Sequence, residues 1–306
     1  MFKHTCVLGS IVFGLLSFQV FADEPTPPPT PPLTPATATS VDEAEAIPRI
    51  DVLADKRIRE MGAMLSKLQK FRFSVEIMYD EVEPDGQKVQ LGRRSRVEVM
   101  RPNGLRVESQ GDRGWDKLSV FDGKHFLLHD RGQKIYSTVE TPGTLDKFFQ
   151  FLFDEYGVSP PLVDFLVSDV HASLTEGADS GALLGDAFVA EKACDHIVFS
   201  NDVLDWQIWI EKGAKPLPRK FVITYKDVDV RPQYTAIFRE WDSDASLDAA
   251  RFTATPPADI ASVPLRRFVD DQADGDPAAG DSAANDGATN DGANAQEVDS
   301  DSREGE

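Results

Sequence analysis

The amino-acid sequence predicts an α+β protein built around one large, strongly curved antiparallel β-sheet. Apolar and polar residues alternate with a period of two over residues 71–139 and again over residues 183–241, with a helical stretch between them. Tight-turn sequences such as Asp122-Gly123 separate the alternating segments, as in β-hairpins. Strands do not alternate with long helices, so a parallel doubly wound sheet is not expected.

An amphipathic helix is predicted over residues 51–69, before the first strand. Its apolar residues recur at helical spacing, and Asp51 is placed to cap its N-terminus. These apolar residues are Leu53, Ile58, Met61, Leu65 and Leu68. The period changes at Phe71, where a strand begins, and turns at Pro84-Asp85-Gly86 and Asn103-Gly104 then predict a meander of short strands.

A helical insertion is predicted over residues 144–176, between the two sets of strands. Thr141 or Thr144 caps a first helix that Gly157 ends, and Pro160-Pro161 opens a second. A third short helical turn is expected at Val170–Glu176. These segments are rich in aromatic residues, so we expect them to lie on the apolar face of the sheet.

Five strands are predicted after the insertion. They are Leu183–Val189, Cys194–Ser200, Leu204–Ile210, Lys220–Tyr225 and Tyr234–Trp241. In the third of these, alternation places Trp206 on the inner face and Trp209 on the outer face. Together with Tyr136, the outward Trp209 is a candidate for a protein-binding surface, and a partly covered position at the rim of the sheet is the favoured interpretation.

Both ends of the chain are expected to lie outside the folded domain, which we place at residues 48–268. Lys3, an apolar run and Val20-Phe21-Ala22 follow the order of a cleavable secretory signal peptide at residues 1–22. Cys6 lies too early for a lipobox, so a periplasmic protein without lipid anchor or stable membrane insertion is expected. Residues 23–47 are rich in Pro and Thr, which is typical of a disordered spacer.

An acidic disordered tail is predicted at residues 269–306. It contains 12 Asp and Glu residues and one Arg, a net charge of −11 out of −20 for the whole chain. With so few apolar side chains, it cannot offset the entropy lost on ordering. The remaining domain is moderately acidic and has no basic stripe, which argues against a nucleic acid partner.

No motif in the sequence is typical of a catalytic or metal site, and no cofactor is expected. His125 and His129 are four residues apart in a predicted strand, or about 13 Å, which is too far for one metal ion. Cys194 and His196 lie about 6.5–7 Å apart on one strand face, whereas a nucleophilic pair needs contact near ~3 Å. With Cys6 removed, Cys194 also has no partner for an internal disulfide. We therefore expect a protein that is not an enzyme, with an unrecognised hydrolase as a weak alternative.

The aromatic side chains of the strands and the insertion are candidates for the lining of a ligand cavity. Such a cavity would lie between sheet and helices and hold a lipid, an acyl chain or another apolar molecule. The alternative is that the same residues fill an ordinary core, and the residues alone favour that alternative. The candidates are Phe73, Phe126, Phe148, Phe149, Phe165, Trp206, Phe221 and Phe238.

Several runs of the sequence resemble a family of predicted periplasmic proteins known as domain of unknown function 2092. The runs are Phe121-Asp122-Gly123-Lys124, Pro142-Gly143-Thr144-Leu145-Asp146, Cys194-Asp195-His196, Asp205-Trp206-Gln207-Ile208-Trp209-Ile210-Glu211 and Pro216-Leu217-Pro218-Arg219-Lys220-Phe221-Val222-Ile223-Thr224-Tyr225-Lys226-Asp227. The resemblance spans roughly residues 48–256 and implies a fold similar to the LolA/LolB lipoprotein-carrier group. There, an incomplete curved barrel closes over helices and holds lipid or acyl chains. The family has no assigned activity, so the resemblance implies no site residues.

Two functions follow as predictions. The first is a periplasmic carrier or binding protein for lipid, a lipidated protein or another apolar ligand, held between the sheet and the helices. The second is an interaction or sensor module that uses the same fold to bind an envelope protein and encloses no ligand. A filled interior would favour the second function, and a void that opens between the helices and the sheet would favour the first.

Overall fold

The computed structural model describes residues 49–160 and 162–265. The expected signal peptide, spacer and acidic tail lie outside the described residues.

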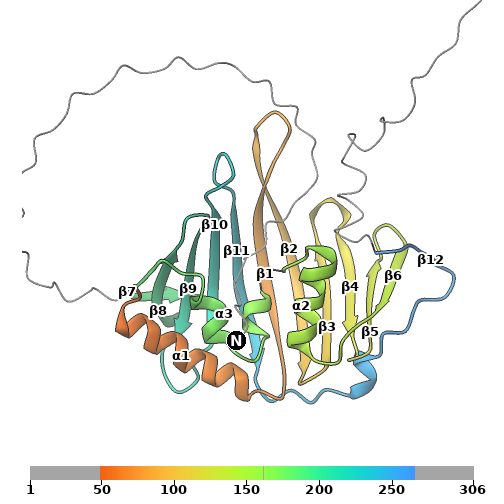
Figure 1. Cartoon of the computed structure of the whole chain (residues 1–306), viewed down its shortest axis with the longest axis horizontal. Coiled ribbons are helices and arrows are strands. Elements are labelled where there is room, and N and C mark those ends of the chain that lie inside the picture. The colour runs from red at the N-terminus through yellow and green to blue at the C-terminus, as the bar shows by residue number, and fades with distance from the viewer. Residues whose placement is uncertain (1–48, 161, 266–306) are drawn as a thin grey trace, which may run out of the picture.

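Twelve strands of the described chain form one sheet, in the order β12-β6-β5-β4-β3-β2-β1-β11-β10-β9-β8-β7 (Figure 1). The first six are β1 (Lys70–Val82), β2 (Lys88–Met100), β3 (Gly104–Gly111), β4 (Asp116–Phe121), β5 (His125–Asp130) and β6 (Ile135–Glu140). The others are β7 (Ser180–Val189), β8 (Lys192–Ser200), β9 (Leu204–Glu211), β10 (Pro218–Tyr225), β11 (Gln233–Asp242) and β12 (Ala261–Ser262). All neighbours are antiparallel except β12, which runs parallel to β6.

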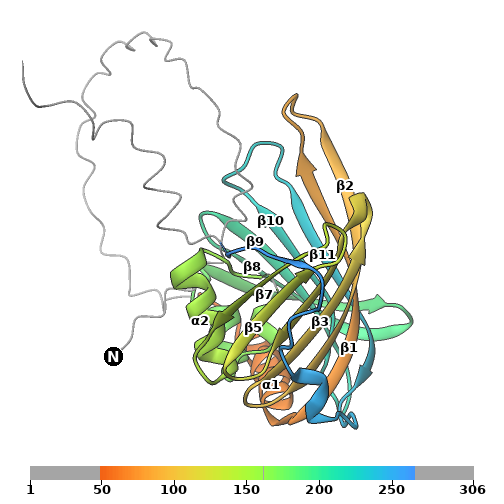
Figure 2. The ribbon, with the colours of Figure 1, turned by 90° about the vertical axis from the view of Figure 1, so that its right-hand side faces the viewer.

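The sheet is strongly curved, as predicted. Figure 2 shows both edges of the sheet bending toward the side on which the helices lie. The strand order leaves β7 and β12 as unjoined edges, so the sheet does not close into a complete barrel. We call the helix-bearing side the concave face and the opposite side the convex face.

Three α-helices and a short 3-10 helix lie on the concave face (Figures 1 and 2). They are α1 (Val52–Lys67), α2 (Leu145–Tyr156), α3 (Val170–Thr175) and η2 (Val163–Phe165). Asp51 caps α1, because its Oδ1 accepts hydrogen bonds from Leu53 N at 2.6 Å and Ala54 N at 3.1 Å. Two further 3-10 helices are η1 (Asp112–Gly114) and η3 (Ala249–Phe252).

The ends of α2 confirm the chemistry expected from the sequence. Of the two candidate caps, Thr144 is used, with its Oγ1 accepting a hydrogen bond from Lys147 N at 3.4 Å. Gly157 ends the helix in the left-handed region, at φ 63°, where a side chain would be strained.

The apolar positions Val97 and Val99 predict a second strand that begins at Arg93, whereas β2 begins at Lys88. Pairing continues without interruption to Val82 and Lys88. An ion pair of 3.2 Å between Lys88 Nζ and Asp80 Oδ2 lies across this extension. In this extension Val89 and Leu91 alternate with Gln90 and Gly92, and Leu91 is buried, so the alternation is a signal that the prediction does not use.

Asp164, in η2, is a carboxyl group buried in the core region, with 4% of its surface exposed. Ser173 Oγ donates a hydrogen bond of 2.5 Å to its Oδ1. Burial raises the pKa of Asp164 from 3.8 to about 6, because the charged form loses its hydration.

We predict that Asp164→Asn stabilises the protein at pH 7.5. The folded state holds the proton of Asp164 more tightly than the unfolded state, so this group favours folding most below pH 3.8 and progressively less as pH rises to about 6. Removing the charge should raise the free energy of unfolding at pH 7.5 by ~1–3 kcal/mol and flatten its pH dependence between about 4 and 6. Urea denaturation across this range measures both effects. The exposed Asp202→Asn is the control, and equal behaviour of the two variants would contradict the prediction.

Candidate functional site: the concave face of the sheet

The structure brings all eight predicted cavity residues together between the sheet and the helices. Seven are buried, and Phe149 is partly buried against the same apolar cluster. Phe73, Phe126, Trp206, Phe221 and Phe238 come from five strands, whereas Phe148 and Phe149 come from α2 and Phe165 from η2. Each strand contributes only its inward positions, because side chains alternate between the two faces of a sheet.

Under η2 and α3, these side chains are in contact with one another. The Phe165 ring meets Phe221 and Phe238 edge-on, with centroids 5.1 Å and 5.2 Å apart. Trp206 Nε1 donates a hydrogen bond of 3.2 Å to Leu174 O, so its indole is fixed to α3. In this conformation, aromatic side chains fill this part of the interior.

Under α2, three side chains of the helix are buried, namely Leu145, Phe148 and Leu152. The Phe148 ring is fully buried and stacks on Phe121, with a centroid distance of 4.3 Å and an interplanar angle of 6°. It also packs at 5.1 Å against Phe126. Phe148 is therefore the bulkiest of the buried side chains that hold α2 on the sheet.

The first turn of α2 is hydrogen-bonded to neighbouring segments. Leu145 N donates to Pro102 O at 2.9 Å, and Ser168 donates to Asp146 Oδ1 through its N at 2.8 Å and its Oγ at 2.9 Å. Near the other end, 37% of Phe153 and 45% of Val158 are exposed. The helix is thus held at its N-terminus and presents apolar surface to solvent at its C-terminal end.

The concave face changes from apolar to polar along β2–β5. Near α2, the register aligns Val99, Leu105, Phe121 and Phe126 as one apolar row across four strands. Two rows further along, the aligned residues are Ser95, Ser109, Lys117 and Asp130. We call this second set the polar row. Sequence reasoning missed it, although hydrophilic residues at inward positions of these strands are the signal that reveals it.

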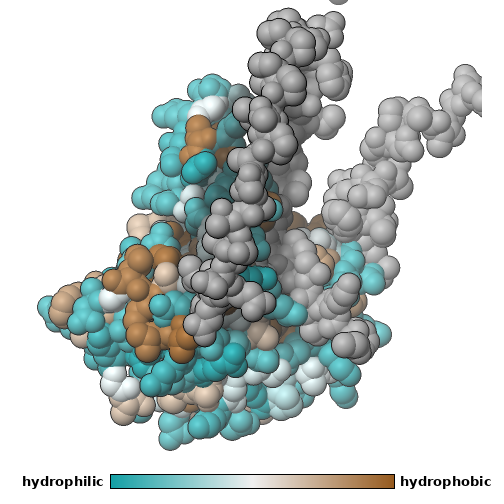
Figure 3. All heavy atoms as spheres, turned by 60° about the vertical axis from the view of Figure 1, so that its left-hand side comes forward, coloured by the Kyte–Doolittle hydropathy of each residue, from teal (hydrophilic) through white to brown (hydrophobic). Residues whose placement is uncertain are grey.

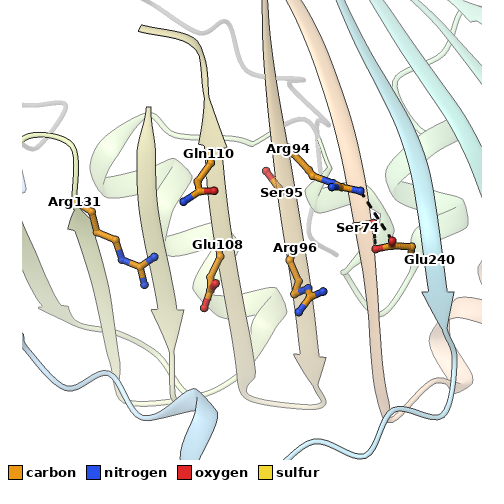
Figure 4. A pocket seen from close by; sticks show the side chains of 8 residues that line it. All are labelled: Ser74, Arg94, Ser95, Arg96, Glu108, Gln110, Arg131 and Glu240. Carbon is orange, nitrogen blue, oxygen red and sulfur yellow. Dashed lines mark hydrogen bonds and ion pairs between the residues drawn. The ribbon is translucent and has the colours of Figure 1, made fainter. Parts of the chain in front are cut away.

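A polar pocket of about 260 Å³ lies elsewhere, with most of its lining on the convex face. Its lining residues are Ser74, Arg94, Ser95, Arg96, Glu108, Gln110, Arg131 and Glu240. Figure 4 shows these side chains spread over neighbouring strands, where Glu240 meets Arg94 at 4.0 Å and accepts a hydrogen bond of 2.7 Å from Ser74 Oγ. Arg96 lies opposite Glu108 in register. Alternating charges of this kind stabilise neighbouring strands and do not converge on one point.

The Cys194–His196 segment has the arrangement expected of a strand. Asp195 faces α1, where its Oδ2 lies 2.6 Å from Arg57 Nε. His196 stacks on Trp209 at 4.0 Å and its Nε2 lies 3.0 Å from Gln207 Oε1. Burial raises the pKa of the Cys194 thiol, which disfavours the nucleophilic thiolate.

Within residues 49–160 and 162–265, no group of three or more His, Cys, Asp or Glu side chains is arranged to hold a metal ion. No helix in these ranges is both long enough and apolar enough to cross a membrane.

The fold and the site together define a class of protein: a curved, open antiparallel sheet that carries helices on an aromatic concave face. The chain belongs to the family described as predicted periplasmic protein (DUF2092), whose model matches residues 54–266. This membership agrees with the periplasmic location expected from the sequence. No curated protein matches the chain.

Solved structures show distant likeness to this chain. An uncharacterized conserved protein from Thermus thermophilus has a TM-score of 0.43 and 13% identity, covering 69% of this chain and 99% of that one. A LolA superfamily protein from Nitrosomonas europaea has a TM-score of 0.33 and 7% identity, covering 65% and 97%. The Mycobacterium tuberculosis lipoprotein LppX has a TM-score of 0.33 and 10% identity, covering 65% and 100%. With TM-scores below 0.5, these likenesses carry no conclusion about function.

We predict that Phe148→Ala costs about 3–5 kcal/mol of stability, because it removes a fully buried ring and leaves a cavity against Phe121 and Phe126. Phe153→Ala, on the same helix but exposed, should cost less than ~1 kcal/mol. Urea denaturation of the two variants checks the difference. Equal losses would show that Phe148 does not anchor α2.

Proposed function

We propose that this protein is a non-enzymatic periplasmic carrier that binds a lipid, a lipidated protein or another apolar ligand between the sheet and α2. The observation that carries the proposal is the aromatic concave face beneath α2, a helix whose first turn is hydrogen-bonded to neighbouring segments and whose Phe148 stacks on Phe121 of that face. Lifting the C-terminal end of α2 would expose the aromatic face of the sheet without breaking any strand pair. Gly143 and Gly157 flank the helix and would serve as hinges.

The energies involved are compatible with such an opening. Exposing the buried side chains of Phe148 and Leu152 to water costs about 1.5–3 kcal/mol for each. An acyl chain that enters the same space gains about 0.8 kcal/mol for each buried CH₂ group. Several methylene groups therefore offset the lost contacts, and a long chain leaves a surplus to set against the entropy lost on binding.

In this proposal, α1 and the insertion complete the enclosure of the curved sheet, in the manner of an incomplete LolA/LolB-like barrel. α1 and α3 form its fixed wall. Asp55 Oδ1 of α1 lies 2.7 Å from His171 Nε2 of α3, and Arg57 of α1 contacts Asp195 of β8 at 2.6 Å. α2 forms the movable wall.

The second candidate is an envelope interaction module that encloses no ligand. It is supported by the filled interior under η2 and α3, and by the edge strand β7. On β7, 61% of Leu184 and 77% of Phe188 are exposed. Figure 3 shows a hydrophobic patch on this side of the molecule. Apart from Asp186, which pairs with Lys212, this edge strand carries no charge, and exposed apolar residues on a sheet edge are suited to pairing with an extended segment of another protein.

Native mass spectrometry of the full chain, purified from a periplasmic extract, tests the carrier. We predict a stoichiometric adduct of lipid size, which organic extraction releases. Phe149→Asp should weaken the adduct because it places a charge on the apolar side of α2, whereas the exposed Phe188→Asp on β7 should leave it unchanged. Circular dichroism must show that both variants remain folded.

The opposite result is a clean apo mass in a protein that takes up neither lipids nor an apolar fluorescent dye. That result would reject the carrier and favour the interaction module. Loss of a co-purifying protein partner in Phe188→Asp alone would support that second candidate directly.

A further inference from the structure

Beyond the polar row, toward the turn that joins β1 to β2, the concave face carries a cluster of aromatic and cationic side chains. The Arg93 guanidinium carbon lies 5.3 Å from the centre of the Tyr79 ring and 4.9 Å from that of Trp115. Lys117 Nζ lies 4.2 Å from the Trp115 ring. We call these four residues the Arg93 cluster. They come from β1, β2, β4 and the segment just before β4.

Two hydrogen-bond donors of this cluster are buried and have no acceptor. Arg93 Nε and Trp115 Nε1 each have less than 1 Å² of exposed surface and no hydrogen-bond partner in the described chain. A buried donor without a partner costs about 1–3 kcal/mol, so such groups are commonly explained by an absent water, ion or ligand. Both donors belong to side chains in contact with each other, which points to a shared acceptor.

The nearby carboxylates are already engaged by other groups. Lys117 pairs with Asp130 at 3.0 Å, Arg113 pairs with Glu81 at 2.6 Å, and Asp112 accepts a hydrogen bond from Gly92 N at 2.6 Å. Glu83 pairs with Arg113 at 2.5 Å. Arg93 forms no ion pair with any described residue, although cation–π contacts hold it in place. None of these carboxylates pairs with Arg93, so its guanidinium has no ion-pair partner among the described residues.

The hydroxyl of Tyr234 completes the surroundings of Arg93. Tyr234 is buried, with 2% exposed, and lies opposite Tyr79 in register. It interacts with Arg93, and burial, the larger effect, raises the pKa of its phenol. Its hydroxyl therefore stays protonated and contributes no negative charge beside the guanidinium.

We propose that the Arg93 cluster binds the anionic head group of an amphiphile whose apolar chain lies along the aromatic concave face. This inference rests on the carrier function proposed above and specifies the ligand: a chain that ends in a carboxylate or phosphate. Arginine and an indole N–H together provide donors suited to such an oxyanion.

The dimensions of the face agree with this ligand. Arg93 and Val99 are six residues apart on β2, or about 20 Å along the strand, which is the scale of a long acyl chain. Between them, the inward position at Ser95 is polar and small, and Val97 and Val99 are apolar. The face therefore passes from charged to apolar in the order that an anionic amphiphile requires.

Binding of palmitate, hexadecanol and acetate to the full chain, measured by isothermal titration calorimetry, tests the inference. Palmitate has both the anion and the chain, hexadecanol has only the chain, and acetate has only the anion. We expect Arg93→Gln to raise the Kd of palmitate ~10-fold or more and to leave that of hexadecanol within ~2-fold. Arg94→Gln, the next residue on the opposite face, is the matched control and should change neither.

Trp115→Phe gives a second test if Arg93→Gln does not fold, since it keeps an aromatic ring at this position and removes the Nε1 donor. It should weaken palmitate and spare hexadecanol. Equal binding of palmitate and hexadecanol, unaffected by either variant, would overturn the head-group site while leaving the carrier intact. Tight acetate binding in the absence of chain binding would also overturn it, in favour of a free-anion site. Failure of both palmitate and hexadecanol to bind would remove the carrier and this inference with it.

Discussion

Burial of the inward face of β1 is the constraint on which the rest of the structure depends. Phe71, Phe73, Val75 and Ile77 are each at most 4% exposed, and each would lose about 1.5–3 kcal/mol if left in water. β1 also joins the two halves of the sheet, because it pairs with β2 on one side and with β11 on the other. The apolar inward face of this central strand must be shielded from water, and the helices on the concave face shield it.

The helices differ in the contacts that attach them to the sheet, and the proposed function builds on this difference. α1 and α3 contact each other and the sheet through charged pairs, including Arg57 with Asp195 and Asp55 with His171. Trp206 adds a hydrogen bond between the sheet and α3. α2 is hydrogen-bonded to neighbouring segments at its first turn and has an aromatic stack further along. In the proposed function, α1 and α3 form the fixed wall and α2 forms the wall that moves.

The sequence predicts the architecture well because burial of one face makes apolar residues recur every second position in strands and at helical spacing in helices. The turn sequences and the alternation of β8–β11 identify those strands to within about two residues, and the helical spacing from Ile58 to Leu68 identifies α1. Leu53, expected on the same apolar face of the helix, is instead 56% exposed. β12 is not predicted because a pair of residues is too short to show a period, and the outer half of the β1–β2 hairpin is missed although Val89 and Leu91 alternate there. The curvature itself was expected from the family resemblance together with the aromatic load.

The site is predicted less completely, for a physical reason. Large aromatic residues such as Phe148 and Trp206 identify the interior, but composition does not distinguish a filled core from the wall of a binding site. The Arg93 cluster escapes sequence reasoning because its residues are far apart in the chain and meet only through strand register. What reveals it is the combination of buried donors without acceptors and an arginine without a carboxylate.

The most direct test of this account is amide hydrogen exchange of the ligand-free protein, followed residue by residue under native conditions. If α2 is the movable wall, the amides of residues 148–156 should exchange through a local opening whose free energy lies several kcal/mol below that of global unfolding. The amides of α1 and the central strands β1 and β11 should then require global or near-global unfolding. Exchange of α2 and β1 with the same free energy would contradict the account, because the helix would then open only when the whole domain unfolds.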